Sequence, residues 1–399
     1  MERYDAVIVG AGPAGATLAG LLAQAGWSVA IVEKAMFPRR KVCGEFLSAT
    51  NYPLLERLGL REAFDAAAGP EIRRVGFLAG DASVMARMPR ARGGAAWGRA
   101  LGREHLDTLL LRRAQELGAT VLQPWSAAAI ERHGPLWTCT ARSAESDTSR
   151  RLSAPLVVAA HGSWEAGALP TQAEARRQRE RMRTGDLIGF KARFRDCALS
   201  PDLMPLLAFP GGYGGMVASD GGRVSLSCCV RRDTLAQLRR RYAGFRAGEA
   251  VLEHIQASIA GARDALAGAA LDGPILSAGP IRPGIRARVQ GGIFLVGNAA
   301  GEAHPVIAEG ISMAMQSAGL LFDCLMRHVG TARSPDLERA ARDYSRRWRA
   351  ALAPRIVASA ALAAMAMRPG PATAMRAIVG LWPRALTAGA YLAGKTKLA

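Results

Sequence analysis

The stretch at residues 5–34, DAVIVGAGPAGATLAGLLAQAGWSVAIVEK, decides the fold of this 399-residue chain. Its first residues form an apolar run rich in Val and Ile, as expected for a buried parallel strand. A glycine turn and a helix of small residues follow, ending at Gly26, and residues 28–34 return as a second strand. The order strand, helix, strand predicts a βαβ unit and therefore an α/β fold.

Gly10, Gly12 and Gly15 form the pattern G-x-G-x-x-G directly after the first strand and at the start of the helix. Gly10 permits the tight turn, Gly12 lets the backbone approach a pyrophosphate, and Gly15 allows close packing of the helix. The helix N-terminus then faces the phosphate charge. Glu33 ends the second strand, where an acidic side chain accepts hydrogen bonds from ribose hydroxyls. We therefore predict a dinucleotide site, and the motif alone does not separate NAD from FAD.

The next part of the chain continues the alternation of helix and strand. Residues 102–119 have helical periodicity with a glycine stop, and residues 120–125 have the pattern of a strand. We expect a hairpin over residues 127–142, with its turn at residues 133–134. Residues 152–163 predict one further buried strand that runs into a glycine turn.

From about residue 185 the segments alternate and break at glycines, which indicates antiparallel strands. A helix is expected around residues 235–260. Residues 291–301 then predict a strand and turn that bring the chain back to the first domain. The tail, residues 355–399, is apolar and helical in pattern, with a break at residues 368–371.

The net charge of +19 comes almost entirely from arginine, because the chain contains only five lysines. A basic surface attracts nucleic acid, anionic lipid or an acidic carrier protein. No helix-turn-helix, zinc-finger or RNA-binding pattern accompanies the charge, so we expect no nucleic-acid partner. The segment RRQRERMR at residues 176–183 is interpreted as a solvated helix or loop.

The six cysteines form no CxxC pair and no zinc-like cluster with the six histidines, so we predict no metal site. They favour a reducing, cytoplasmic setting. The N-terminal residues lack the pattern of a signal peptide, and we see no uninterrupted apolar run long enough to span a bilayer.

Besides residues 5–34, three more stretches of the sequence have recognisable patterns: RRKVCGEFLS at 39–48, FPGGYGGMV at 209–217 and VGNAAGEAHPVIAEGISMAM at 296–315. Together they resemble the signatures of FAD-dependent oxidoreductases in the geranylgeranyl reductase branch of the para-hydroxybenzoate hydroxylase superfamily. The resemblance implies a Rossmann-like FAD-binding domain of the GR2 type, an inserted β-rich substrate domain over the flavin ring, and a helical C-terminal tail. FAD is the implied cofactor, with NAD(P)H as a candidate electron donor.

On this basis the chain divides into three regions. The FAD-binding domain comprises residues 1–75, 101–175 and 286–330; the substrate domain comprises strands in 76–100 and the body 176–285; residues 331–399 form the C-terminal helical region. The tail is expected to pack on the FAD domain, with a position on a membrane surface or over the substrate cavity as the alternatives.

By the same resemblance, the late stretch binds the opposite end of the FAD that the early turn binds. The family carries Gly-Asp where this chain has Gly297 and Asn298; Asn still accepts through its side-chain oxygen but lacks the charge. The helix beginning near Gly310 would aim its N–H groups at the pyrimidine edge of the flavin. The residues predicted to contact FAD are Gly10, Gly12, Pro13, Ala14, Gly15, Glu33, Lys34, Arg40, Cys43, Arg103, Gly297, Asn298, Ala299, Pro305, Glu309, Gly310 and Ile311.

The family pattern Arg-x-x-x-Asp matches Arg103 and Asp107, so Arg103 is expected to contact FAD, or else to form only a charge pair at a helix start. Cys43 would lie by the flavin, where its basic neighbours favour a reactive thiolate; the alternative is a small buried apolar residue. Glu45 is either a general acid or a salt-bridge partner of Arg39 or Lys41.

His304 is the third catalytic candidate, as a proton donor beside the flavin ring, with a hydrogen-bonded loop histidine as the alternative. Tyr213 and Phe209 are predicted to line the substrate cavity, unless the glycine-rich stretch is simply a bent strand.

The implied activity is hydride transfer between flavin N5 and an apolar, unsaturated substrate of polyketide or isoprenoid type, in secondary metabolism. A carrier protein or a reductase is a candidate partner. A monooxygenase that captures oxygen as a C4a-hydroperoxide is the alternative, and a non-catalytic flavin-binding protein is the third hypothesis. His161 stands where hydroxylases of the superfamily carry Asp, which weakens hydroxylation, and the Trp-x-Trp-x-Ile-Pro motif of tryptophan halogenases is absent. The aromatic signature of archaeal and plant geranylgeranyl reductases is not evident either, which weakens prenyl reduction.

Overall fold

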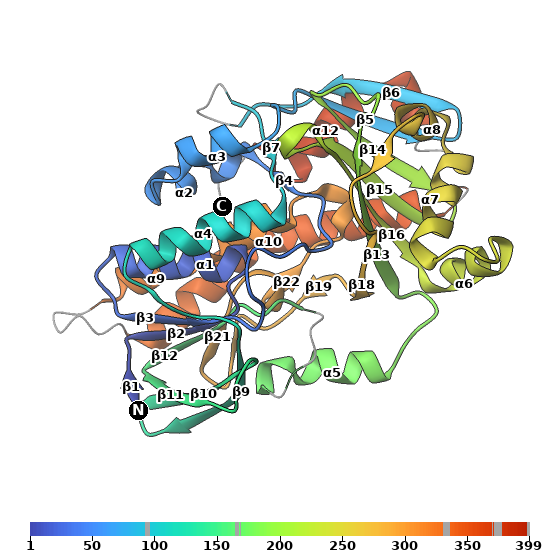
Figure 1. The fold of residues 1–399 in the computed structure, drawn as a ribbon. Coiled ribbons are helices and arrows are strands. Elements are labelled where there is room, and N and C mark those ends of the chain that lie inside the picture. The colour runs from blue at the N-terminus through green and yellow to red at the C-terminus, as the bar shows by residue number, and fades with distance from the viewer. Residues whose placement is uncertain are drawn as a thin grey trace.

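The computed structural model describes residues 1–91, 96–163, 167, 169–329, 336–368, 370 and 377–396. Two large sheets organise this part of the chain, and Figure 1 shows them side by side, with the N-terminal sheet at the lower left and the other at the upper right. The predicted Rossmann-like α/β fold with a β-rich second sheet and a helical C-terminal region is confirmed.

The first sheet contains the βαβ unit. Its order is β20-β21-β12-β2-β3-β8, and all neighbours are parallel except β20 and β21. Every residue of β2, β3 and β12 is buried, which explains their continuous apolar sequences. The strands are β2 (Ala6–Val9), β3 (Val29–Val32), β8 (Thr120–Leu122), β12 (Leu156–Ala159), β20 (Val289–Gln290) and β21 (Ile293–Leu295).

Helices cover one face of this sheet and a smaller sheet covers the other (Figure 1). Helix α1 packs between α4 and α9, since it contacts both. The smaller sheet has the order β1-β11-β10-β9, with the predicted hairpin formed by β9 and β10. These elements are α1 (Pro13–Gln24), α4 (Arg103–Glu116), α9 (Gly310–Arg327), β1 (Glu2–Arg3), β9 (Trp125–His133), β10 (Leu136–Ser143) and β11 (Ser149–Ala154).

The second large sheet has eight strands in the order β17-β13-β16-β15-β14-β5-β6, with β18 paired to β13. Helices α6, α7 and α8 cover its outer face and enclose a second hydrophobic core. The strands are β5 (Arg74–Ala79), β6 (Ala82–Arg87), β13 (Leu187–Arg195), β14 (Leu203–Phe209), β15 (Gly212–Ala218), β16 (Val224–Arg231), β17 (Ala270–Leu271) and β18 (Leu276–Ile281); the helices are α6 (Arg232–Arg241), α7 (Ala247–Ser258) and α8 (Ala260–Leu266).

Shorter elements connect the two sheets: β4 (Phe46–Leu47) paired with β7 (Arg99–Ala100), β19 (Gly284–Ile285) paired with β22 (Gly301–Glu302), and the helices α2 (Tyr52–Arg57), α3 (Arg61–Ala67) and α5 (Ala173–Glu180). The C-terminal helices α10 (Leu337–Ala366) and α12 (Arg384–Leu392) pack against both sheets. The basic segment at residues 176–183 lies largely on the helix α5, as one of its two interpretations expected.

Three expectations about elements need correction. The buried strand expected within residues 152–163 is β12, but the segment also holds the end of β11, because the chain passes there from the small sheet to the parallel sheet. The helix expected at 235–260 is divided among α6, α7 and α8; α6 ends shortly before Gly244, whose φ of +97° is unsuited to a helix. The C-terminal helix begins earlier than residue 355, since α10 runs unbroken through Pro354.

Among the described residues, one helix meets a criterion of length and mean hydropathy for a membrane span, although arginines interrupt it. Within α10 an 18-residue window has a mean hydropathy of 1.3, so this helix is long and apolar enough to cross a membrane. That criterion rests on length and composition alone, and 39% of the window is buried inside the protein.

Candidate functional site

A cavity of about 510 Å³ lies between the two large sheets, a size that suits a cofactor or small-molecule site. Its walls come from segments distant in sequence: the turn after β2, the loop before β4, strands β14 to β16, and the start of α9. The predicted FAD contacts that line it are Gly10, Gly12, Pro13, Ala14, Glu33, Lys34, Cys43, Arg103, Gly297, Asn298, Pro305, Gly310 and Ile311.

The early glycines divide into two that pack and one that faces open space. A Cβ at Gly10 would lie 2.7 Å from the Ala160 carbonyl oxygen, and one at Gly15 would lie 1.9 Å from the Gly10 carbonyl oxygen. A Cβ at Gly12 would meet only the Arg103 side chain, at 3.8 Å. The N-terminus of α1 therefore has room beside Gly12 for a phosphate group, where the helix dipole favours negative charge.

Glu33 is held in place by the backbone on both sides of it. Its carboxylate accepts from the Ala11 N–H at 2.8 Å and from the Ala35 N–H at 3.0 Å, and the residue is 5% exposed. Arg39 lies near it, with Nη2 3.8 Å from Glu33 Oε2. A carboxylate fixed this way, at the end of the second strand, is suited to accept from ribose hydroxyls.

The late turn approaches the same helix from the other side. Gly297 has φ +61°, and a Cβ there would lie 2.9 Å from the Ala14 Cβ, so the turn needs glycine. The Asn298 side-chain amide donates to Glu302 Oε1 at 3.0 Å, which leaves the Asn298 oxygen as the group able to accept from a ligand. Burial raises the pKa of Glu302 against the opposing effect of Arg286.

The start of α9 also opens onto the cavity. Ala308 adopts the left-handed conformation, with φ +51°, and turns the chain into the helix. A Cβ at Gly310 would have no neighbour within 4 Å, so the space beside this residue is free for a ligand. Its neighbour Glu309 precedes the helix without capping it by its side chain. The first N–H groups of α9 are therefore available to an electronegative ligand edge.

These observations fit FAD in one orientation. The early edge offers a phosphate space at Gly12 and a ribose acceptor at Glu33, which suit the ADP half. The late edge offers an amide oxygen at Asn298 and an open helix start at Gly310, which suit the ribityl chain and the flavin ring. Among the described residues, no group of three or more His, Cys, Asp or Glu side chains is arranged to hold a metal ion.

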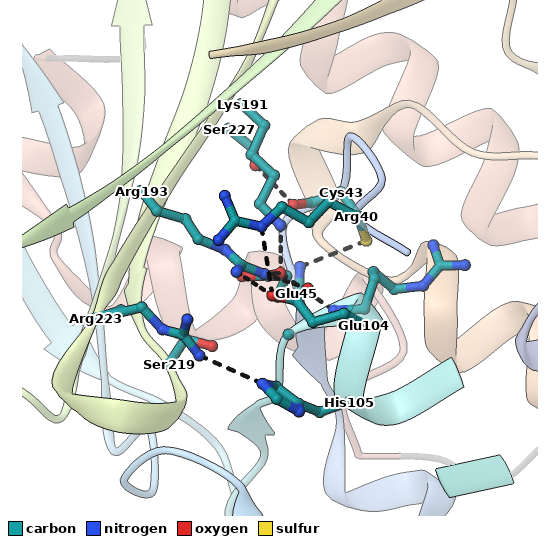
Figure 2. A network of polar contacts seen from close by, with 12 residues as sticks. Arg40, Cys43, Glu45, Glu104, His105, Lys191, Arg193, Ser219, Arg223 and Ser227 are labelled. Carbon is teal, nitrogen blue, oxygen red and sulfur yellow. Dashed lines mark hydrogen bonds and ion pairs between the residues drawn. The ribbon is translucent and has the colours of Figure 1, made fainter. Parts of the chain in front are cut away.

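Glu45 is the centre of a buried ion network at the boundary between the two sheets (Figure 2). It has φ +61° and is 1% exposed. Its Oε1 accepts from Lys191 Nζ, from Arg193 Nη2 at 2.6 Å and from the Arg103 backbone N–H at 3.2 Å. The expected partners Arg39 and Lys41 are therefore wrong: the cations come from β13, because Glu45 turns toward the start of α4.

Two further acids complete this network. Glu104 Oε2 accepts from Arg193 Nη2 at 2.5 Å, and Asp220 Oδ1 accepts from the Gly102 N–H at 2.6 Å. Three carboxylates thus surround the N-terminus of α4, where the helix dipole stabilises them. Burial lowers the pKa of Lys191, although the attraction of Glu45 opposes the shift. The network ties strand β13 of the second large sheet to the loop before β4 and to the start of α4.

Cys43 faces this network from the loop before β4. Its sulfur accepts from the Glu45 N–H at 3.4 Å, and its carbonyl accepts from Ser227 Oγ at 2.8 Å.

Burial would lower the pKa of Arg103, but the attraction of Asp107 and a smaller contribution from Cys43 raise it. The charge pair predicted for Arg103 is present, with Nε 2.7 Å from Asp107 Oδ1, and Arg103 also lines the cavity.

Tyr213 and His304 form a pair between the cavity and the core. The Tyr213 hydroxyl lies 3.1 Å from His304 Nδ1, and the roles of donor and acceptor depend on the tautomer. Burial lowers the pKa of His304 to about 4 and raises that of Tyr213 well above its usual value. Both groups are therefore neutral at pH 7, and Tyr213 is the one that lines the cavity.

Several predicted site residues lie elsewhere. Phe209 faces away from the cavity because side chains alternate along β14: Met204 and Leu206 line the cavity, whereas Phe209 packs in the second core against His254. Arg40 is not part of the cavity wall: its Nη1 donates to the Asp272 carbonyl at 3.4 Å, and its Nε lies 3.8 Å from Glu104 Oε1 in the network of Figure 2. Four other predicted site residues are not part of the cavity wall, although each is next in sequence to a residue that is. They are Gly15, Ala299, His304 and Glu309.

Sequence reasoning missed Lys191, Arg193 and Glu104, and it named Arg39 only as a partner of Glu45, whereas Arg39 lies near Glu33 and Asp107. Lys191 and Arg193 lie on β13, where a charged residue on an apolar strand is the one signal that could have identified them. His161, expected to weaken hydroxylation, lines the cavity, with Nε2 2.9 Å from Thr171 Oγ1.

The fold and the cavity together define a flavoprotein in which a Rossmann-like domain and a second sheet enclose a dinucleotide site. A family model described as an FAD binding domain matches residues 3–353, and the chain belongs to this family, within the superfamily of para-hydroxybenzoate hydroxylase-like flavoproteins. FAD is the cofactor of the family.

Known relatives differ in activity. The chain is 26% identical over 317 residues to tryptophan 2-halogenase from Chondromyces crocatus, a match that covers 78% of this chain and 59% of that protein. It is 34% identical over 130 residues to menaquinone reductase from Mycobacterium tuberculosis, covering 32% and 31% of the two chains. The chain thus spans about three fifths of the length of the halogenase.

Among solved structures, PqsL from Pseudomonas aeruginosa, described as a probable FAD-dependent monooxygenase, superposes with a TM-score of 0.72 at 19% identity. That match covers 93% of this chain and 98% of PqsL and shows a shared fold.

Proposed function

We propose that the protein is an FAD-dependent oxidoreductase that transfers hydride between the flavin and an apolar, unsaturated small molecule. The observation that carries this proposal is the position of Tyr213: the residue lines the cavity together with apolar residues such as Met204 and Leu206, and its neutral hydroxyl lies 3.1 Å from His304 Nδ1. Bound FAD supplies the hydride donor or acceptor at its N5 atom.

The residues around the cavity hold the proton that accompanies the hydride. In the direction of C=C reduction, one carbon receives the hydride and its neighbour receives a proton from the Tyr213 hydroxyl. His304 Nδ1 orients that hydroxyl at 3.1 Å, so the proton is held at a fixed point. Because burial keeps both groups neutral, the pair brings no net charge to an apolar substrate. Dehydrogenation runs the same transfers in reverse.

The choice of reductase over other chemistries rests on two supports. The stretch at 39–48 resembles geranylgeranyl reductases, and menaquinone reductase, which acts on an isoprenoid quinone by its name, is a relative over about a third of this chain. The same proposal includes a polyketide or isoprenoid substrate of secondary metabolism and NAD(P)H as the electron donor. It also includes a carrier protein or a reductase as partner and a cytoplasmic location.

Anaerobic reoxidation of the reduced enzyme tests the proposal. The FAD-loaded protein is reduced with dithionite, mixed with a short-chain prenylated naphthoquinone or a conjugated polyene, and followed at the visible flavin band. The proposal predicts substrate-dependent reoxidation with product two hydrogens richer, and slower reoxidation in Y213F. If no probe in either class accelerates reoxidation while oxygen does, hydride transfer to such substrates is contradicted.

Oxygen transfer is the second candidate, favoured by the likeness to a halogenase and to a probable monooxygenase. The same probes are incubated with the reduced enzyme under labelled oxygen. Label in the product supports oxygenation, and unlabelled reduced product supports hydride transfer.

A further inference from the structure

The C-terminal segment at residues 384–396 reaches the flavin site although it lies beyond the family match, which ends at residue 353. Helix α12 packs against β5 and β6, and Thr387 Oγ1 donates to the Arg87 carbonyl at 2.8 Å. The chain then turns at Gly394, with φ +91°, and buries Lys395 to 6% exposure. The segment therefore runs from the substrate sheet to the interior of the protein.

Lys395 ends directly behind the wall of the cavity. Its Nζ donates to Glu309 Oε1 at 2.8 Å and to the Ile307 carbonyl at 3.2 Å, and it lies 4.4 Å from the centre of the Phe46 ring. Phe46 lines the cavity, and so do Ala308 and Gly310 on either side of Glu309. The ammonium group thus contacts the loop that leads into α9 and one further part of the cavity wall.

Glu309 needs this cation for an electrostatic reason. The residue is 0% exposed, and its Oε2 has no hydrogen-bond partner among the described residues. Its carboxylate stands one residue before Gly310, at the end of α9 that carries positive dipole charge. An uncompensated carboxylate there would oppose that charge. Burial lowers the pKa of Arg355 nearby, while the attraction of Glu309 opposes this shift, so Arg355 is a second, weaker counter-charge.

We propose that Lys395 is a positioning residue of the flavin site: it holds the loop 304–310 and cancels the charge of Glu309, so that the start of α9 can stabilise the anionic reduced flavin. The inference rests on the proposed FAD site. It assigns to the C-terminal segment the control of the flavin reduction potential, through electrostatics at the helix start rather than through contact with substrate.

The midpoint potential of the bound flavin tests this assignment without any substrate. K395M should favour oxidised over reduced FAD by about tenfold, which corresponds to about 30 mV in the negative direction for a two-electron couple. E309Q removes the negative charge and should shift the potential in the positive direction. K395R, which keeps the charge, and R384M, which removes an exposed charge from the same segment, should match the wild type within about 10 mV.

If Lys395 has only a structural role, K395M and E309Q would shift the midpoint potential of the flavin in the same direction or leave it unchanged. Either result overturns the inference. If K395M does not retain FAD, the K395M/E309Q double variant and E309Q alone decide: potentials at the wild-type value in both overturn the assignment. A wild-type protein that binds no FAD refutes the proposed function and this inference together. A yellow wild-type protein with unshifted variants refutes the inference alone.

Discussion

Replacing Glu45 by Gln should destabilise the protein by about 3 kcal/mol, because two buried cations lose their shared counter-charge. Removing one partner of a buried pair typically costs about 3–5 kcal/mol. The lower end applies here because Arg193 keeps Glu104 as a second partner, with Nη2 to Oε2 at 2.5 Å. Lys191 is the group most affected: it is 2% exposed, and Glu45 is its only hydrogen-bonded carboxylate among the described residues.

A double-mutant cycle with K191M isolates this effect. The apparent free energy of unfolding is measured by urea titration with circular dichroism for the wild type, E45Q, K191M and E45Q/K191M. Because K191M removes the cation that E45Q leaves unpaired, the double variant should be more stable than the sum of the singles by at least about 1 kcal/mol.

A matched control uses the exposed pair of Arg74 and Asp202, whose side chains are 42% and 34% exposed. D202N should cost less than about 1 kcal/mol, as is usual for surface pairs. Additivity of E45Q and K191M within about 0.5 kcal/mol, or an E45Q cost no larger than that of D202N, would refute the account of the network.

Three further predictions concern the cavity. In the wild type, His304 is neutral when folded, with a pKa of about 4 against 6.5 when unfolded, so stability should fall as pH drops from about 6.5 to 4; H304Q should flatten this dependence in urea titrations. Y213F should slow the proton-coupled step by about a hundredfold in stopped-flow measurements while leaving the flavin spectrum unchanged, and an unslowed variant would exclude Tyr213 as the donor. N298D restores the acid usual in the family, but it places a second carboxylate where Asn298 now donates to Glu302 at 3.0 Å, so thermal unfolding should show a loss of stability of about 1–3 kcal/mol.

The sequence identified the parts of the site that depend on backbone geometry. Gly10 and Gly12 were predicted from their spacing between a strand and a helix, and Gly297 from the family resemblance of the late stretch; the structure places all three on one cavity. Local patterns of this kind survive folding because a tight turn or a close approach demands glycine whatever surrounds it.

The ion partners of Glu45 could not be predicted in the same way. Lys191 is 146 positions from Glu45 in the chain, and only the docking of β13 against the start of α4 brings the two together. The neighbours Arg39 and Lys41 were nearer in sequence, but the carboxylate of Glu45 bonds to Lys191 and Arg193 instead. Phe209 was misplaced for a different reason: a one-residue step along β14 reverses the face to which a side chain points.

The central claim is that residues 10–15 and 297–310 bind opposite halves of one FAD. It is tested most directly by calorimetric titration of G12V and G310V with FAD, ADP and riboflavin. Both positions have open space for a larger side chain, so both variants should fold. G12V should lose ADP and keep riboflavin, G310V should lose riboflavin and keep ADP, and both should lose FAD. If either variant binds FAD as tightly as the wild type, or if both lose the same fragment, the claim is contradicted.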